Sequence, residues 1–77
     1  MTNIKFENEK NSWTEFTCDG TPGFLFFYGD EANIESPADP FFSIPTKAMS
    51  LEELKEDDAA YEKTMECIEA FAAMARV

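Results

Sequence analysis

The chain has 77 residues, among them eight Phe, one Trp and two Tyr, and this size and composition predict a single folded domain over 1–77 and disfavour disorder. Sixteen Asp and Glu against six Lys and Arg give a formal net charge of −10, which argues against direct binding to nucleic acid or an anionic membrane. The N-terminal residues are polar and acidic, unlike a secretory signal, and the apolar runs are too short to span a bilayer. We therefore expect a cytoplasmic protein, in the host cytoplasm if it is encoded by a phage.

The N-terminal residues predict a β-hairpin. Ile4 and Phe6 alternate with charged residues in an expected strand over 2–8, and a polar cluster over 8–11 marks a turn. A second expected strand, over 12–18, places Phe16 on one face and Trp13 on the other.

A turn over 19–23, rich in Gly and Pro, precedes the most apolar segment of the chain. Residues 24–28 read Phe-Leu-Phe-Phe-Tyr and predict a central strand that is apolar on both faces. Each face is therefore either covered by the fold or, in part, meets a partner. Pro37, Pro40 and Pro45 weaken the pattern over 31–46, where we expect an ordered loop, with a short edge strand at 41–44 as the alternative.

A C-terminal helix over 51–75 is the clearest predicted element. Ser50 and Glu53 fit a capping box, in which the serine accepts a hydrogen bond from the third amide of the helix and the glutamate reaches back. No Gly or Pro follows Ser50, and apolar residues recur three and four apart, with Asp58 as the one break in their stripe. The sequence thus predicts an α+β fold, in which a small antiparallel sheet of three to four strands (2–8, 12–18, 24–28 and, as the alternative to a loop, 41–44) is packed by one long helix.

The chain lacks the residues that most catalytic and metal sites need. It has no His, and it contains neither a Gly-x-Gly-x-x-Gly motif nor a P-loop. Cys18 and Cys67 lack C-x-x-C spacing and each has an acidic neighbour, which disfavours a reactive thiolate, so we expect two reduced and packed thiols rather than a disulfide. We therefore expect no enzyme activity, no cofactor and no metal site.

Negative charge accumulates in two stretches of the sequence. No Lys or Arg occurs from residue 11 to residue 46, and the helical segment contains like-charge i,i+4 pairs that a surface selected for stability alone would avoid. Either these carboxylates keep an aromatic-rich protein soluble, or their spacing imitates a nucleic-acid backbone and occupies a basic groove on another protein. We expect partner contacts from the carboxylates and from two aromatic hot spots: Asp30, Glu31, Glu35, Asp39, Glu52, Glu56, Trp13 and Tyr28.

In size, acidity and missing catalytic residues, the chain is similar to short acidic phage proteins that block host or defence machinery, including anti-CRISPR proteins and DNA mimics. It is also similar to acidic immunity proteins and antitoxins. No motif carries this resemblance, so it gives no residue a role. It implies a non-enzymatic inhibitor of a basic, Lys/Arg-rich protein that processes nucleic acid. The alternative is an assembly or adaptor module that acts as a homodimer or through the apolar helix end at 70–75.

Overall fold

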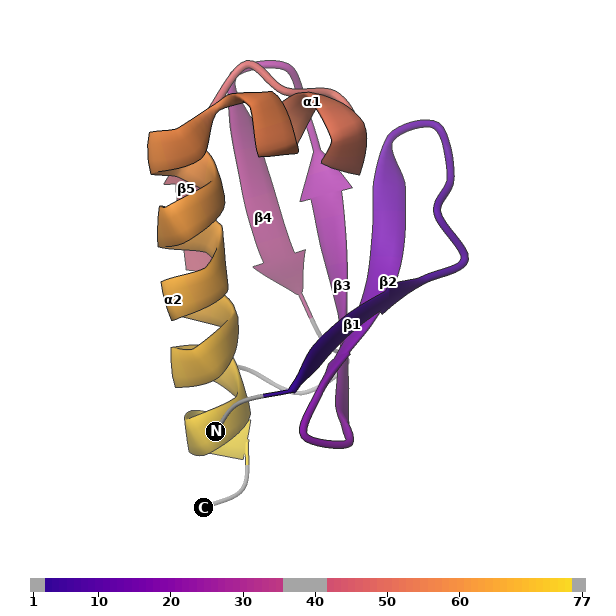
Figure 1. The fold of residues 1–77 in the computed structure, drawn as a ribbon, viewed down its shortest axis with the longest axis vertical. Helices are drawn as coiled ribbons and strands as arrows, with labels where there is room; N and C mark the ends of the chain where they lie inside the picture. The colour runs from indigo at the N-terminus through magenta and orange to yellow at the C-terminus, as the bar shows by residue number, and fades with distance from the viewer. Residues whose placement is uncertain (1–2, 36–41, 76–77) are drawn as a thin grey trace.

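The computed structural model describes residues 3–35 and 42–75 and confirms the α+β class. Within these residues, five strands form one antiparallel sheet in the order β1-β2-β3-β4-β5, so that neighbours in the sequence are neighbours in the sheet. Both helices follow the sheet in the sequence and pack on one of its faces (Figure 1). The elements are β1 (Ile4–Glu7), β2 (Trp13–Cys18), β3 (Thr21–Phe27), β4 (Glu31–Glu35), β5 (Phe42–Pro45), α1 (Leu51–Glu56) and α2 (Asp58–Ala75).

Two tight turns set the register of the central strands. Asp19 and Gly20 both have positive φ, +51° and +90°, which is the backbone of a two-residue type I′ hairpin between β2 and β3. In the next turn Gly29 has a φ of +92°, and the Tyr28 amide donates to the Glu31 carbonyl at 2.9 Å. This second turn ends β3 and starts β4, so both hairpins close without a long loop.

The strand β4 is a finding that the sequence did not predict. Residues 31–35 were expected in a loop, because Glu, Ala and Asn have low strand propensity and their pattern does not stand out. The segment is held by its neighbours on both sides, since it pairs with β3 over Phe24–Phe27 and with β5 over Phe42–Pro45. The edge strand that was the alternative to a loop at 41–44 is present as β5 over Phe42–Pro45, and residue 41 lies outside the described residues. The sheet therefore has five strands where three to four were predicted.

The strand β3 also begins earlier than predicted, at Thr21 instead of Phe24. The turn over 19–23 therefore shrinks to two residues, and Pro22 and Gly23 belong to the strand. Cys18 and Thr21 are the hydrogen-bonded pair that closes the type I′ turn, and Thr17 and Pro22 are the next pair along the two strands. In an antiparallel ladder this next pair is not hydrogen-bonded, so the nitrogen of Pro22 points away from β2. The paired part of β3 on the β4 side starts at Phe24, and the missing donor of Pro22 therefore breaks no described ladder bond.

The predicted helix over 51–75 is correct in its bounds and wrong in its continuity, because it is broken at Asp57. Asp57 has a φ of −105° and a ψ of 89°, and its amide donates to the Leu54 carbonyl, which ends α1. Its side chain then accepts from the Ala60 amide at 3.3 Å, and its carbonyl from the Tyr61 amide at 2.8 Å, which starts α2. Asp58, which interrupts the apolar stripe, directly follows the break, and its side chain is exposed to solvent.

The predicted helix cap is present with one difference. The Ser50 hydroxyl accepts from the Glu53 amide at 3.2 Å, as a capping box requires. The Glu53 carboxylate accepts instead from the Met49 amide at 3.0 Å, one residue before the serine. These bonds fix α1 at the end of the sheet where β3 stops and β4 begins (Figure 1).

The core lies between the sheet and the helices. Phe16, Leu25 and Ile34 from the sheet are fully buried against Ile68 and Phe71 of α2. At the apolar helix end over 70–75, Phe71 and Ala72 contact the core, whereas Ala70, Ala73 and Met74 are exposed. The side chain of residue 75 lies outside the described part. Within residues 3–35 and 42–75, no helix is both long and apolar enough to cross a membrane.

Candidate functional site

The sheet face opposite the helices carries a row of aromatic side chains. Strand alternation turns Leu25 and Phe27 into the core, so that Phe24, Phe26 and Tyr28 lie on the other face. Trp13 pairs with Phe26 in the register of β2 and β3 and joins this row from β2. No described helix covers this surface, which we call the open face and define as Trp13, Glu15, Phe24, Phe26, Tyr28, Glu31, Asn33 and Glu35.

The four rings of the open face contact one another as a continuous ladder. The ring centroids are 5.9 Å apart for Trp13 and Phe24, 6.0 Å for Trp13 and Phe26, and 6.1 Å for Phe24 and Phe26. Tyr28 continues the row at 6.4 Å from Phe26, with an interplanar angle of 26°. Trp13, Phe24 and Phe26 are half-buried, whereas 55% of Tyr28 is exposed. Mutual contact holds these rings in place, and the ladder forms one continuous, partly exposed aromatic surface.

Carboxylates flank the aromatic ladder on both sides. Phe24 lies directly between Glu15 on β2 and Glu35 on β4 in the strand register. The Tyr28 hydroxyl donates to Glu35 Oε2 at 3.2 Å, and the Asn8 side-chain amide donates to Glu15 Oε2. Desolvation, the negative charge of Glu35 and the hydrogen bond to it all raise the pKa of Tyr28. The open face therefore combines a neutral phenol, three further rings and fixed negative charge.

One buried polar atom on the open face has no hydrogen-bond partner within the described part of the chain. Asn33 pairs with Phe26 on β3 and with Ser43 on β5, so its side chain belongs to the same face. Only 8% of this residue is exposed, and its Oδ1 atom accepts no hydrogen bond from residues 3–35 or 42–75. Natural proteins satisfy nearly all such atoms, so this oxygen is an exception within the part of the chain that the structure describes.

The structure brings four of the eight predicted contact residues onto this face, namely Trp13, Tyr28, Glu31 and Glu35. Asp30 is exposed in the turn at the end of the same surface. Glu52 and Glu56 lie elsewhere, on α1, which directs Leu51 and Leu54 into the core on the helix side of the sheet. Asp39 lies outside the described residues. The predicted carboxylates therefore do not form one surface.

Sequence reasoning missed four members of the open face: Glu15, Phe24, Phe26 and Asn33. The signal for the two phenylalanines was present, because a strand that is apolar on both faces needs a cover for each. Phe24 and Phe26 could be assigned to the uncovered face only once one helix layer had been placed on the other. Asn33 carried no signal, since β4 was not predicted.

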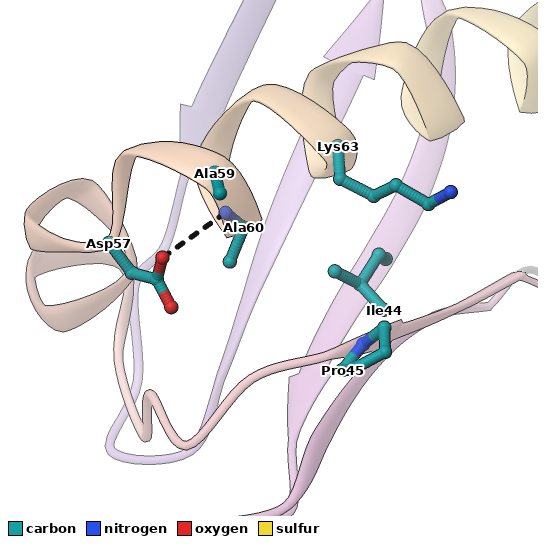
Figure 2. A pocket seen from close by; sticks show the side chains of 6 residues that line it. All are labelled: Ile44, Pro45, Asp57, Ala59, Ala60 and Lys63. Carbon is teal, nitrogen blue, oxygen red and sulfur yellow. Dashed lines mark hydrogen bonds between the residues drawn. The ribbon is translucent and has the colours of Figure 1, made fainter.

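A pocket of about 360 Å³ lies on the other side of the sheet from the open face, between β5 and the start of α2 (Figure 2). Figure 2 shows Ile44 and Pro45 on one side and Asp57, Ala60 and Lys63 on the other. The Asp57 carboxylate in this pocket already caps α2, because it accepts a hydrogen bond from the Ala60 amide. Nothing in this pocket forms a nucleophile with an adjacent base, and it carries no catalytic interpretation.

The thiols and acidic groups of the described residues do not form a reactive centre. Cys18 is buried in β2 and Cys67 is half-buried in α2, and the two are not joined by a disulfide. Burial raises the pKa of Cys67, with Glu66 adding to the shift and Lys63 opposing it, so its reactive thiolate form is disfavoured. Residues 3–35 and 42–75 contain no group of three or more Cys, Asp or Glu side chains that could hold a metal ion.

Comparison of this chain with protein-family models, with curated proteins and with solved structures finds no match.

Proposed function

We propose that this protein is a non-enzymatic inhibitor that binds a basic surface of a nucleic-acid-processing protein through the open face of its sheet. The single observation that carries this proposal is the ladder of Trp13, Phe24, Phe26 and Tyr28 flanked by Glu15 and Glu35. Large aromatic side chains dominate the binding energy of protein interfaces, and carboxylates beside them select a cationic partner.

The chemistry of the open face favours protein over nucleic acid as its ligand. Proteins that bind single-stranded DNA or RNA also use exposed aromatic rings on a sheet, which stack on the bases. Those surfaces carry positive charge along the path of the phosphate backbone. Here the ladder is bordered by Glu15, Glu31 and Glu35, and the whole chain has a net charge of −10. Phosphates would be repelled, whereas Lys and Arg would be attracted by charge and by the ring faces.

An acidic protein that binds the nucleic-acid-binding surface of its partner would inhibit that partner. A cationic patch that binds nucleic acid is itself rich in Lys and Arg, so an acidic domain seated on it would exclude the nucleic acid sterically. The adaptor alternative has less support, because Phe71 and Ala72 of the apolar helix end are buried in the domain's own core. Met74 is the large apolar side chain that this end leaves exposed within the described residues.

Two triple variants of equal charge test this proposal. Glu15→Gln/Glu31→Gln/Glu35→Gln alters the open face, and Glu52→Gln/Glu62→Gln/Glu66→Gln alters exposed positions of the two helices. Each changes the net charge from −10 to −7, because three glutamates become neutral. The amides keep the size of each side chain, so the fold should be preserved in both.

The association rates of the wild type and the two triple variants with a panel of purified basic DNA- and RNA-processing proteins are measured by interferometry, at low and at moderate salt. Acidic enzymes are the negative control. For a bound basic protein, the open-face variant should associate about tenfold more slowly while the helix variant changes little. Duplex DNA should compete for the same protein. Binding confined to acidic proteins, equal losses in the two variants, or a ternary complex with DNA would each contradict the proposal.

A further inference from the structure

The position of Phe24 specifies which cation the open face can hold best. Phe24 lies between two acidic residues in the strand register, since Glu15 and Glu35 are its direct partners on the neighbouring strands. One oxygen of each carboxylate accepts a hydrogen bond, from the Asn8 side-chain amide and the Tyr28 hydroxyl respectively. Adjacent strands are about 4.8 Å apart, so both carboxylates lie within reach of a group that rests on the ring. A cation at this position would meet the ring face and two negative edges together.

A guanidinium group matches this arrangement better than an ammonium group. It is planar, so it can stack on an aromatic face while its edge donates hydrogen bonds to carboxylates on either side. It is also weakly hydrated and loses little on leaving water. The ammonium group of lysine is a compact and strongly hydrated charge that cannot lie flat on a ring.

The neighbouring row of the sheet is also polar. Asn33 is the direct register partner of Phe26, two residues along β3 from Phe24, and its Oδ1 atom is buried without a partner among the described residues. The groups that the open face presents to a ligand are therefore its rings and the carboxylates beside them.

Building on the proposed function, we infer that the open face recognises arginine in preference to lysine, with a guanidinium stacked on Phe24 between Glu15 and Glu35. The cognate basic surface is then an arginine-rich one. Arginine preference separates this proposal from simple charge attraction, because peptides of equal charge would otherwise bind alike.

The test uses the full chain with capped hexa-arginine and hexalysine peptides as probes. Trp13 is the chain's single tryptophan and lies in the ladder, so its fluorescence reports binding at the site. At about 150 mM salt, where long-range attraction is screened, hexa-arginine should bind about tenfold more tightly than hexalysine. Phe24→Leu keeps an apolar side chain without a ring and should reduce this ratio to near unity. Glu62→Gln, on the helix, should leave the ratio unchanged.

The outcomes separate this inference from the proposed function. Equal affinity for the two peptides, with a Trp13 response, would overturn the arginine preference and leave a cationic ligand on the open face. A failure of both peptides to bind, or amide shifts confined to the helices in NMR spectra, would overturn both. If Phe24→Leu does not fold, Phe24→Met replaces it, because it also keeps an apolar side chain without a ring, and an unchanged ratio in that folded variant also contradicts the inference.

Discussion

Gly23→Ala should destabilise the protein, although alanine is the better residue in most strands. Gly23 is buried in β3 directly opposite Phe16. A Cβ atom added there would lie 2.5 Å from Phe16 Cζ and 3.0 Å from Phe71 Cε2. These two rings form an edge-to-face pair at 5.6 Å in the fully buried core, so neither can move without disturbing the other.

Two opposing effects set how much the Gly23→Ala variant loses in free energy of unfolding. Overpacking a core by one carbon costs about 1–3 kcal/mol, while replacing Gly restricts the unfolded chain and returns about 0.4–1 kcal/mol. The net destabilisation should be about 1–2 kcal/mol. For a domain of this size each kcal/mol lowers the Tm by about 4–8 °C, so thermal and urea unfolding followed by circular dichroism should resolve the effect.

A double-mutant cycle identifies the cause. Phe16→Leu removes the Cζ atom that the new methyl group would meet, so the Gly23→Ala/Phe16→Leu double variant should lose less stability than the sum of the single losses. Gly20→Ala is the matched control, because it is strained through its φ of +90° but meets no atom within 4 Å, and its loss should add independently. A Gly23→Ala variant as stable as the wild type, or strict additivity with Phe16→Leu, would refute the close packing.

The remaining predictions concern the cap, the core and the open face. Ser50→Ala should lower stability by about 0.5–2 kcal/mol in urea unfolding, and no change would contradict the cap. Ile68→Ala should cost about 2–5 kcal/mol, and a smaller loss accompanied by a change of oligomeric state in sedimentation would move Ile68 from the core to an interface. Asn33→Val should raise the Tm, because it removes a buried oxygen without a described partner, whose cost is about 1–3 kcal/mol; a lower Tm would show that the oxygen has a partner. Glu35→Gln should lower the pKa of Tyr28 in an alkaline absorbance titration, because the raised pKa is due in part to this carboxylate. The corresponding stability is present below the unfolded tyrosine pKa of about 10 and is lost as the pH rises through the higher folded value, so an unchanged titration would contradict the Tyr28–Glu35 bond.

The sequence was informative where a local pattern and the tertiary fold agree. The alternation over 12–18 correctly separates Phe16 from Trp13, and Ser50 marks the start of α1. It failed where neighbours decide the outcome. β4 contains no strong strand former apart from Ile34 and forms because β3 and β5 flank it. The break at Asp57 was not predicted either, since no Gly or Pro marks it. This one residue caps both helices, α1 through its backbone amide and α2 through its carboxylate.

The candidate site was predicted less well than the fold, for a physical reason. Net charge and carboxylate spacing along the chain do not say which groups share a surface. Glu31 and Glu35 reach the open face because β4 is a strand, whereas Glu52 and Glu56 face solvent from a helix that covers the core. The residues of the open face come from three neighbouring strands and are brought together by the strand register. That register depends on turns such as the one at Gly29, which a sequence pattern places only approximately.

The distribution of unfavourable local features supports a binding role for the open face. The buried polar side chains Thr14 and Thr64 on the core side both have hydrogen bonds, and the core around them is apolar. At the edge of the open face, by contrast, Glu7 of β1 lies opposite Glu15 at equal charge. On the open face itself, Asn33 Oδ1 has no described partner and Tyr28 is largely exposed. Each of these features lowers the stability of the free domain, since like charges in register repel and apolar surface remains in water. Local rules tend to be broken where function requires it, and a cationic partner on the open face would offset the like-charge repulsion and cover Tyr28.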